Sequence, residues 1–401
     1  VGGSRGPPSR KVQVVFMKKN LSTLCFAGLV ALTGLVATGC GSDDVVNVAP
    51  VNTATLREYA VIANSGNNSI TVKTVNLGNG TSSVLNNQFT TGVGTTPLIV
   101  KTHPNINVFY VLNNGSATIS QFTLDGNGGV AFLGTVATPP NPTLLAIHPS
   151  GGFVYVVGAT NTASQGTVRR FPVNGNGTLG PAFADKTTTN VYNSTSTSYA
   201  KDADFSFGGG TFHVPTVGAI ESFPVNSDGT LGNGVLTAQA LATDNVRDID
   251  VRPGQASLVA VVRPNAGNDK LRAYALNNGV IGAQAPEVDP GELTLGLADF
   301  ASNGQYYVGS NSNPRMFGFN VANATGVLTA LATNPMAVTT GARSLFVMLD
   351  PSNNFMVSTG GTGDNVLVAR FRGQNGEFVG STADSQSLNS PQGFDFFTFN
   401  F

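Results

Sequence analysis

Acidic and basic residues recur at the start of three successive apolar segments, each of which has the pattern of a β-strand. In two segments a cation is followed by two aspartates spaced two residues apart, and the third segment has one aspartate at the same place. Side chains two residues apart point to the same side of a strand, so each aspartate pair shares one face. The ligand pocket predicted from this pattern consists of Lys201, Asp202, Asp204, Arg247, Asp248, Asp250 and Asp299.

Carboxylates and cations side by side can supply a base that works near neutral pH and a cation for a developing oxyanion, the two groups that a hydrolytic reaction at a carbonyl needs. Arg247 and Lys201 are the candidate cations, and Asp248 is the candidate base, although an aspartate with an ordinary pKa of about 3.9 is a poor base unless it is desolvated. We expect mixed polarity, with Asp202 offsetting Lys201 and Asp248 offsetting Arg247. The bidentate fork of Arg247 would then recognise a carboxylate or a phosphate on a ligand.

The aligned aspartates allow two interpretations. In the first, each aspartate accepts a hydrogen bond from the backbone of a neighbouring strand group or faces water. Together, Asp204, Asp250 and Asp299 would form a carboxylate wall able to hold a hard cation. No metal site is predicted from nitrogen or sulfur ligands, and no cofactor is predicted. The three histidines are in no zinc-ligand spacing and are expected to be structural: His103, His148 and His213.

A four-strand pattern recurs along the chain and positions these residues. Each copy has an apolar strand, a turn, a second apolar strand and an alternating strand that ends in an anchor residue. The anchors lie 45 to 52 residues apart, at Val75, Phe122, Phe171, Phe223, Tyr274, Phe319 and Phe371. Short strands at a fixed period of this size predict an all-β propeller with four-stranded antiparallel blades, here seven of them.

The first copy lacks an innermost strand. It begins at Tyr59, in a segment that matches the second strand of later copies, whereas the aromatic-rich segment from Pro391 to Phe399 has no partners of its own. Pairing the two removes exposed strand edges. We therefore predict that the C-terminal strand closes the ring within the first blade.

The N-terminal region has the pattern of an export signal. Lys18 and Lys19 follow Met17, then come an uncharged apolar run and small residues before Cys40, in the manner of a bacterial lipobox. We predict an upstream leader at 1–16, a lipoprotein signal peptide at 17–39, a tether at 40–55 and the propeller at 56–401. Lipidated Cys40 would attach the protein to the membrane of a bacterial cell envelope, on the outer-membrane or periplasmic side or exported.

Composition excludes some partners. Charged residues make up 11% of the chain and the formal net charge is −1. Nucleic-acid binding needs clustered lysine and arginine, so no nucleic acid is expected. A monomer is expected.

Two segments carry a resemblance to a known family. His148-Pro-Ser-Gly-Gly-Phe-Val-Tyr-Val156 and Phe171-Pro-Val-Asn-Gly-Asn-Gly-Thr-Leu179 resemble the repeats of the lactonase-type seven-bladed propellers, which include 6-phosphogluconolactonases and secreted Tyr-Val-Thr-Asn-repeat relatives. The resemblance implies a mouth arginine at Arg247. Where the family's lactonases have three mouth histidines, this chain has Lys201, Asp248 and Asp299.

The favoured function is a lipid-anchored propeller that binds a small molecule or a protein, or serves as a scaffold, without catalysis. The alternative is a hydrolase of lactones such as 6-phosphogluconolactone. The ligand expected in either case is a lactone, a sugar acid or a protein.

Overall fold

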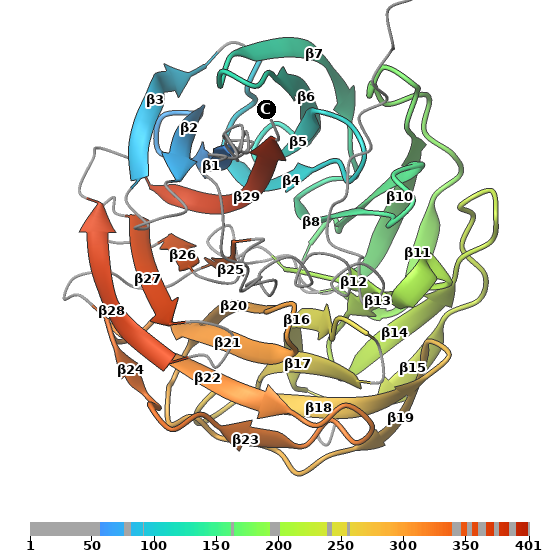
Figure 1. Cartoon of the computed structure of the whole chain (residues 1–401). Coiled ribbons are helices and arrows are strands. Elements are labelled where there is room, and N and C mark those ends of the chain that lie inside the picture. Colours follow the sequence, from blue (N-terminus) through green and yellow to red (C-terminus); the bar gives the residue numbers. More distant parts are fainter. Residues whose placement is uncertain are drawn as a thin grey trace, which may run out of the picture.

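The structure is a computed structural model in which strands surround a central axis (Figure 1). It describes residues 57–75, 82–90, 92–161, 164–192, 201–238, 243–254, 257–338, 346–350, 355–359, 366–372, 377–384 and 390–399. The predicted leader, signal peptide and tether lie outside these residues. In the described part of the chain the strands form seven antiparallel sheets, six of four strands and one of five. We number these sheets as blades 1 to 7 in chain order.

The first three blades come from the N-terminal half of the described chain. Blade 1 contains β29 (Pro391–Phe399), β1 (Arg57–Asn64), β2 (Ser69–Val75) and β3 (Ser82–Phe89). Blade 2 contains β4 (Pro97–Thr102), β5 (Val108–Asn113), β6 (Thr118–Leu124) and β7 (Val130–Ala137). Blade 3 contains β8 (Pro142–Ile147), β9 (Phe153–Gly158), β10 (Gln165–Pro172) and β11 (Lys186–Val191).

The other four blades follow in order. Blade 4 contains β12 (Asp204–Phe205), β13 (Thr211–Pro215), β14 (Ala219–Pro224) and β15 (Val235–Ala238), with the 3-10 turn η1 (Phe207–Gly209) between its first two strands. Blade 5 contains β16 (Asn245–Val251), β17 (Ser257–Arg263), β18 (Lys270–Asn277) and β19 (Val280–Gln284). Blade 6 contains β20 (Leu295–Phe300), β21 (Gln305–Ser310), β22 (Arg315–Val321), β23 (Leu328–Ala330) and β24 (Met336–Ala337), which also pairs with β22. Blade 7 contains β25 (Phe346–Leu349), β26 (Phe355–Thr359), β27 (Val366–Arg372) and β28 (Glu377–Asp384).

The prediction that the C-terminal strand closes the ring is confirmed. Strand β29 pairs antiparallel with β1, with Phe396 opposite Ala60 and Phe394 opposite Ile62. Figure 1 shows the red C-terminal strand beside the blue N-terminal one. The predicted propeller of four-stranded antiparallel blades is confirmed as well, with β24 as an addition to blade 6.

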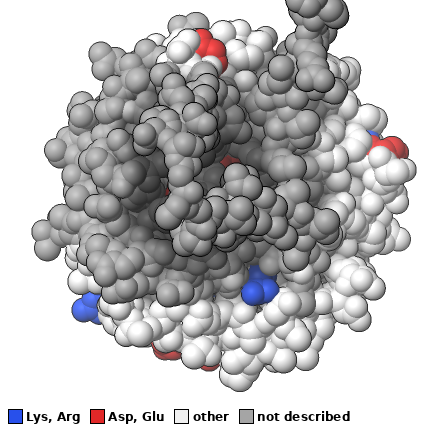
Figure 2. All heavy atoms as spheres, in the orientation of Figure 1, with Lys and Arg blue, Asp and Glu red and all other residues white. Residues whose placement is uncertain are grey.

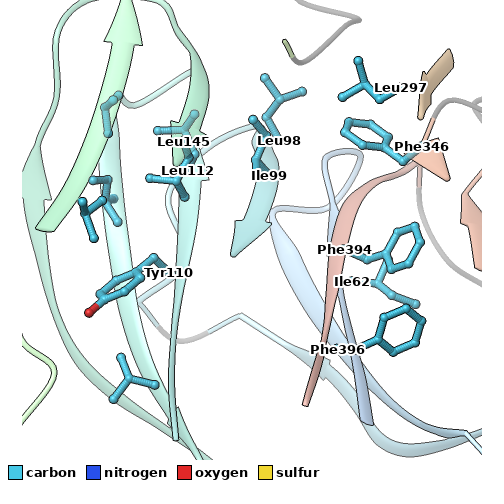
Figure 3. Packing of buried hydrophobic residues seen from close by; sticks show 14 of the residues in the cluster. Ile62, Leu98, Ile99, Tyr110, Leu112, Leu145, Leu297, Phe346, Phe394 and Phe396 are labelled. Carbon is cyan, nitrogen blue, oxygen red and sulfur yellow. The ribbon is translucent and has the colours of Figure 1, made fainter. Parts of the chain in front are cut away.

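Burial follows the position of each strand in its blade. All six residues of β5 and of β21 are buried, because neighbouring blades cover both faces of these second strands. The outermost strand β19 is mostly exposed. One large apolar cluster lies around the closing strand, where Phe394 and Phe396 of β29 pack beside Ile62 of β1 (Figure 3). Among the described residues, no helix is long and apolar enough to span a bilayer.

Tyrosines tie successive blades together. The hydroxyl of Tyr59 donates to the Gly126 carbonyl in the next blade (2.7 Å), and the hydroxyl of Tyr110 donates to that of Gly177 (2.8 Å). Tyr155 bonds in the same way to a carbonyl of blade 4. These contacts fix blades 1 to 4 against one another, and so hold their inner strands at set positions around the axis.

Candidate functional site

One position of each inner strand is equivalent from blade to blade, and five of the seven residues at this position line a common cavity. Strand register places it opposite a fixed position of the second strand, so Asp204 lies opposite His213 and Asp250 opposite Val259. The seven residues at this position, in blade order, are Asp395, Lys101, Ala146, Asp204, Asp250, Asp299 and Met348. The ring therefore carries four aspartates and one lysine, and acidic atoms are visible near its centre in Figure 2.

A small cavity of about 110 Å³ opens at this ring. Its charged lining residues are Lys101, Asp202, Asp204, Asp250 and Asp299. Leu297, Phe346, Val347 and Phe394 are among the apolar ones. Four of the seven predicted pocket residues thus meet in one cavity, which has both a charged wall and an apolar wall.

The cation of this cavity is Lys101, a residue that the sequence analysis missed. Its ammonium lies 2.8 Å from Asp202 Oδ2. Burial would lower the pKa of Lys101, but the charges of Asp202, Asp395 and Asp204 raise it above the ordinary value. Lys101 is therefore charged at neutral pH. The sequence does contain a signal for Lys101. The turns at His103-Pro104 and Arg252-Pro253 are equivalent, and Lys101 precedes the first by two residues as Asp250 precedes the second.

Three aspartates of the ring link neighbouring blades. Each accepts the N–H of the following residue on one carboxylate oxygen and an N–H of the next blade on the other. Asp204 accepts from Phe205 (2.7 Å) and Val251 (3.0 Å). Asp299 accepts from Phe300 (2.8 Å) and Leu349 (3.1 Å).

Asp395, which was also missed, makes the same link across the closing strand. It accepts from the N–H of Phe396 (2.7 Å) and from both the N–H (2.7 Å) and the hydroxyl (2.9 Å) of Thr102. The recurring Asp-Phe dipeptide of β12, β20 and β29 is the sequence signal that identifies it. For these aspartates the backbone-acceptor interpretation therefore applies.

Asp250 is the exception. The two N–H groups that this pattern would supply to it are taken, since the N–H of Val251 donates to Asp204 and that of Phe300 donates to Asp299. Blade 5 is instead linked to blade 6 by Asp248, whose Oδ2 accepts the N–H of Ala298 at 2.6 Å. Asp250 is 9% exposed, and its Oδ2 has no hydrogen-bond partner among the described residues.

Burial and surrounding charge make Asp250 hard to ionise. The pKa of Asp250 is raised well above its ordinary value. The largest cause is desolvation by burial, followed by the charge of Asp248 and then that of Asp299. Burial also raises the pKa of Asp248. The hydroxyl of Tyr306 lies next to Asp250, and burial, the charges of Asp250 and Asp248 and a side-chain hydrogen bond to Asp250 raise its pKa, although that hydrogen bond departs from normal geometry. The Asp248–Asp250 pair is therefore suited to holding a proton at a pH where an ordinary aspartate has lost it.

Lys201 and Arg247 are placed differently from the prediction. Both side chains are buried, and neither is among the residues that line the cavity. The ammonium of Lys201 donates to Asn245 Oδ1 (3.1 Å) and to a backbone carbonyl (3.2 Å), and burial followed by the charge of Arg247 lowers its pKa to about 7. Arg247 donates to the Leu295 carbonyl (3.0 Å).

The predicted pairing is wrong for Lys201, whereas the charge of Arg247 does act on Asp248. Asp202 pairs with Lys101 rather than with Lys201. Arg247 lies 3.6 Å from Asp269, a buried carboxylate that also receives two hydrogen bonds from Arg263. The fork of Arg247 is thus turned toward the protein, and among the described lining residues the expected mixed polarity gives way to four carboxylates and one ammonium.

The histidines have structural contacts. His103 Nε2 lies 2.8 Å from the Gly151 carbonyl, and His148 Nε2 lies 3.2 Å from that of Gly209, each in the next blade. His213 is buried, which lowers its pKa to about 4, and its Nδ1 lies 2.8 Å from the hydroxyl of Ser222. Within the described ranges, no group of three or more His, Cys, Asp or Glu residues is arranged to hold a metal ion. The proposed wall of Asp204, Asp250 and Asp299 does not form such a group.

Fold and site together define a β-propeller with a small acidic pocket on its axis. The family model described as "Lactonase, 7-bladed beta-propeller" matches residues 110–292. This match and the structural neighbours below confirm the resemblance of the chain to lactonase-type propellers. No curated protein matches the sequence.

Solved structures with the same fold include two bacterial proteins. A periplasmic gluconolactonase from Pseudomonas aeruginosa has a TM-score of 0.71 and 16% identity, covering 85% of this chain and 99% of its own. A putative 6-phosphogluconolactonase from Bacteroides fragilis has a TM-score of 0.69 and 14% identity, covering 85% of this chain and 98% of its own. At sequence identities this low, the similarity shows that these proteins share the fold of this chain.

Proposed function

We propose that this seven-bladed propeller binds a small molecule without negative charge in its central cavity, and that Asp250 is the residue that recognises it. One observation carries the proposal: Asp250 lines the cavity, and its Oδ2 is buried without a hydrogen bond of normal geometry to any described residue. An unpaired buried polar atom is costly in a folded protein, so a position that keeps one is expected to have a reason outside the fold. When the carboxylate turns toward the cavity, a ligand hydroxyl or N–H supplies the missing bond.

A second candidate function is the hydrolysis of an uncharged lactone. It is favoured by the presence of Lys101 and Asp250 in the same cavity, because burial removes the objection that an ordinary aspartate is too weak a base. Asp250 would take a proton from water as the water oxygen bonds to the lactone carbonyl carbon, and the ammonium of Lys101 would stabilise the oxyanion. The ring C–O bond then breaks, and the proton passes from Asp250 to the leaving oxygen. Carboxylates of the wall repel the hydroxy acid that forms.

One experiment separates the two functions. The full chain is titrated with glucono-δ-lactone and with its 6-phosphate, and both the heat of binding and acid release are recorded. We expect the uncharged lactone to bind and the phosphorylated one to be excluded by the carboxylates. Asp250→Asn should weaken binding at least tenfold, and any turnover should fall by an order of magnitude or more, because the neutral amide neither accepts a proton nor completes the same bond.

The control is Asp185→Asn, which alters an exposed aspartate paired with Arg169. It should leave binding and turnover unchanged. Heat of binding without acid release supports a binding protein, and acid release that depends on Asp250 supports a hydrolase. If Asp250→Asn alters neither quantity, the cavity is not the functional site.

We further propose that the chain is exported and anchored through Cys40, in keeping with the lipobox pattern of its N-terminal region. Replacing Cys40 with serine in a bacterial host should release the protein from the membrane fraction or leave an uncleaved precursor. Fractionation and lipid labelling measure this. Since one acyl chain binds a membrane only marginally, stable attachment requires more than one chain on the cysteine. Unchanged partitioning and labelling of Cys40→Ser would show that another segment is the anchor.

A further inference from the structure

Blade 4 has the shortest inner strand of the blades that the structure describes. Strand β12 consists of two residues, whereas the inner strands of the other blades have at least four. Only Asp204 and Phe205 pair with β13, opposite His213 and Phe212. Since few strand pairs hold β12 in place, the contacts between blade 4 and its two neighbours contribute more to keeping this blade closed.

A histidine lies on each side of blade 4. His148 follows β8 of blade 3, and its ring packs edge-on against that of Phe205, with the ring centroids 5.2 Å apart. Phe212 and Val214 of β13 belong to an apolar cluster shared with blade 3. Strand alternation therefore turns His213 to the other face of β13, which packs against β16 of blade 5.

The contacts of His148 require a neutral imidazole. Its Nε2 lies 3.2 Å from the Gly209 carbonyl of blade 4, which only accepts, so Nε2 carries the hydrogen. Its Nδ1 accepts the N–H of Ser150 at 3.2 Å and therefore carries none. A proton added to Nδ1 can be donated to the Ser150 hydroxyl at 2.7 Å, but the Ser150 N–H then loses its acceptor. A Cβ at Gly209 would overlap the imidazole, which shows how closely this ring fits blade 4.

His213 has even less room for a second proton. The residue is fully buried, its Nδ1 lies 2.8 Å from the hydroxyl of Ser222, and its Nε2 has no hydrogen-bond partner among the described residues. A protonated ring has two N–H donors and a charge, and Ser222 can accept only one of these donors. Burial accordingly lowers the pKa of His213 to about 4, and it also lowers the pKa of His148.

The titratable groups around His148 are already engaged with other partners. The hydroxyl of Tyr155 on β9 donates to Gly229, and Arg170 on β10 lies 3.9 Å from Asp228. Within the part of the chain that the structure describes, His148 forms no ion pair. A proton on its ring would therefore have no carboxylate beside it.

The groups around His213 come from three strands. Asp204 on β12 lies opposite it in register and accepts two backbone N–H groups. Arg272 on β18 pairs with two carboxylates, and Tyr274 packs in the apolar cluster between blades 4 and 5. The carboxylates of β16 are in register with valines that pack toward blade 6, so they lie on the other face of that strand. The fifth group, Glu221 on β14, accepts from Thr189 of blade 3.

We propose that blade 4 is an acid-sensitive segment of the propeller, which protonation of His148 and His213 loosens from blades 3 and 5. Asp202, Ala203 and Asp204, at the start of this blade, line the central cavity, so its loosening opens one wall of that cavity. The inference does not depend on which ligand the cavity takes.

The direction of the pH effect follows from proton binding. An exposed histidine has a pKa of about 6.5, so below that pH the opened blade binds more protons than the closed one. The closed blade is therefore fully stable above about pH 6.5 and loses stability as the pH falls toward the lowered values. Each proton taken up on opening raises the opening constant about tenfold per pH unit.

Hydrogen exchange of the full chain, followed by mass spectrometry at pH 7.5 and pH 5.0 and corrected for the intrinsic rate at each pH, tests the proposal. We expect protection in peptides of blade 4 to fall about tenfold or more at pH 5.0, while peptides of blade 6 change by less than about threefold. With ¹⁵N-labelled histidine, the rings of His148 and His213 should be neutral at pH 7.5 and become protonated over the pH range in which blade 4 loses protection.

Variants assign the response to the two rings. His213→Asn retains a side-chain partner for Ser222, and His148→Gln retains a donor for the Gly209 carbonyl, but neither new side chain titrates. The double variant should therefore lose most of the pH response, whatever its protection at pH 7.5. The matched control is His103→Gln, which changes a histidine that contacts a glycine carbonyl between blades 2 and 3. It should retain the response of blade 4.

Three results would overturn the proposal. Equal loss of protection in blades 4 and 6 would show that acid unfolds the whole propeller. A response of blade 4 that persists in the double variant would assign it to other groups. If the double variant does not fold, the labelled parent decides: loss of protection in blade 4 while both rings remain neutral would exclude the histidines as its cause.

Discussion

Deletion of Pro391–Phe401 is expected to leave the chain aggregated or to lower its melting temperature greatly. The deletion removes β29, the inner strand of blade 1. Its aromatic residues Phe394, Phe396 and Phe397 are buried, and burial of one such side chain contributes about 1.5–3 kcal/mol. Together they represent much of the net stability of about 5–15 kcal/mol that a typical protein has.

Two further consequences of this deletion act in the same direction. The unpaired edge of β1 is exposed and can pair with another chain. Thr102, which is partly buried, loses the Asp395 carboxylate that accepts its backbone N–H at the junction of blades 1 and 2.

The soluble fraction and the melting temperature measure the effect of the deletion. A chain shortened only by residues 400–401 retains β29 and is the matched control. A soluble deletion of Pro391–Phe401 that melts within a few degrees of the control would contradict closure of the ring by β29.

The fold is predictable from the sequence because the repeat is strongly marked. Buried second strands are mostly apolar, and the third strand ends in an aromatic anchor in every copy but the first, so the blades leave a similar pattern in the sequence. The first copy, which begins at Tyr59, lacks an inner strand, and the aromatic segment from Pro391 to Phe399 lacks a partner. Each therefore indicates that the other is its neighbour. Their pairing in the structure follows from the need to satisfy two strand edges at once.

The pocket is less predictable because strand alternation fails at the inner strands. The register of β16 against β17 shifts between Val246 and Asp248, which places an extra residue, Arg247, outside the regular alternation. Similar shifts occur in β4, β8 and β20. A bulge re-aims side chains in a way that the sequence pattern does not encode, and this is why Arg247 turned toward Asp269 was not predicted.

The distinction between Asp250 and its aligned neighbours could not be predicted either. All four ring aspartates have the same place in the repeat, and three of them accept backbone N–H groups. Only the structure shows that the N–H groups of Val251 and Phe300, which Asp250 would accept, donate to Asp204 and Asp299 instead. By contrast, Lys101 and Asp395 could have been found by extending the alignment of the turns to all copies.

Opposite effects on stability are expected from the same substitution at Asp250 and Asp299. Asp299→Asn replaces an acceptor oxygen by an amide nitrogen, so one of the N–H groups of Phe300 and Leu349 loses its partner. Leaving a buried donor unsatisfied costs about 1–3 kcal/mol. Asp250→Asn breaks no such link and removes a buried carboxylate that the surrounding charges disfavour, so at pH 8 this variant should be more stable than the parent.

The pH dependence of the free energy of unfolding tests whether ionisation of buried Asp250 causes this difference in stability. The folded-state pKa of Asp250 is raised by burial and by Asp248, so between its ordinary pKa and the raised value the folded chain binds more protons than the unfolded one. Parent stability from this group is therefore greatest at low pH and falls as the pH rises through that window. The gain from Asp250→Asn should be present at pH 8 and should be small near pH 4, where the folded-state carboxyl is protonated and the unfolded-state carboxyl, with an ordinary pKa of about 3.9, is about half protonated. Urea unfolding of the parent, Asp250→Asn and Asp299→Asn at both pH values measures these differences. Equal losses of stability for the two variants at pH 8 would show that Asp250 links blades as Asp299 does, and that its free oxygen is not held in place for a ligand.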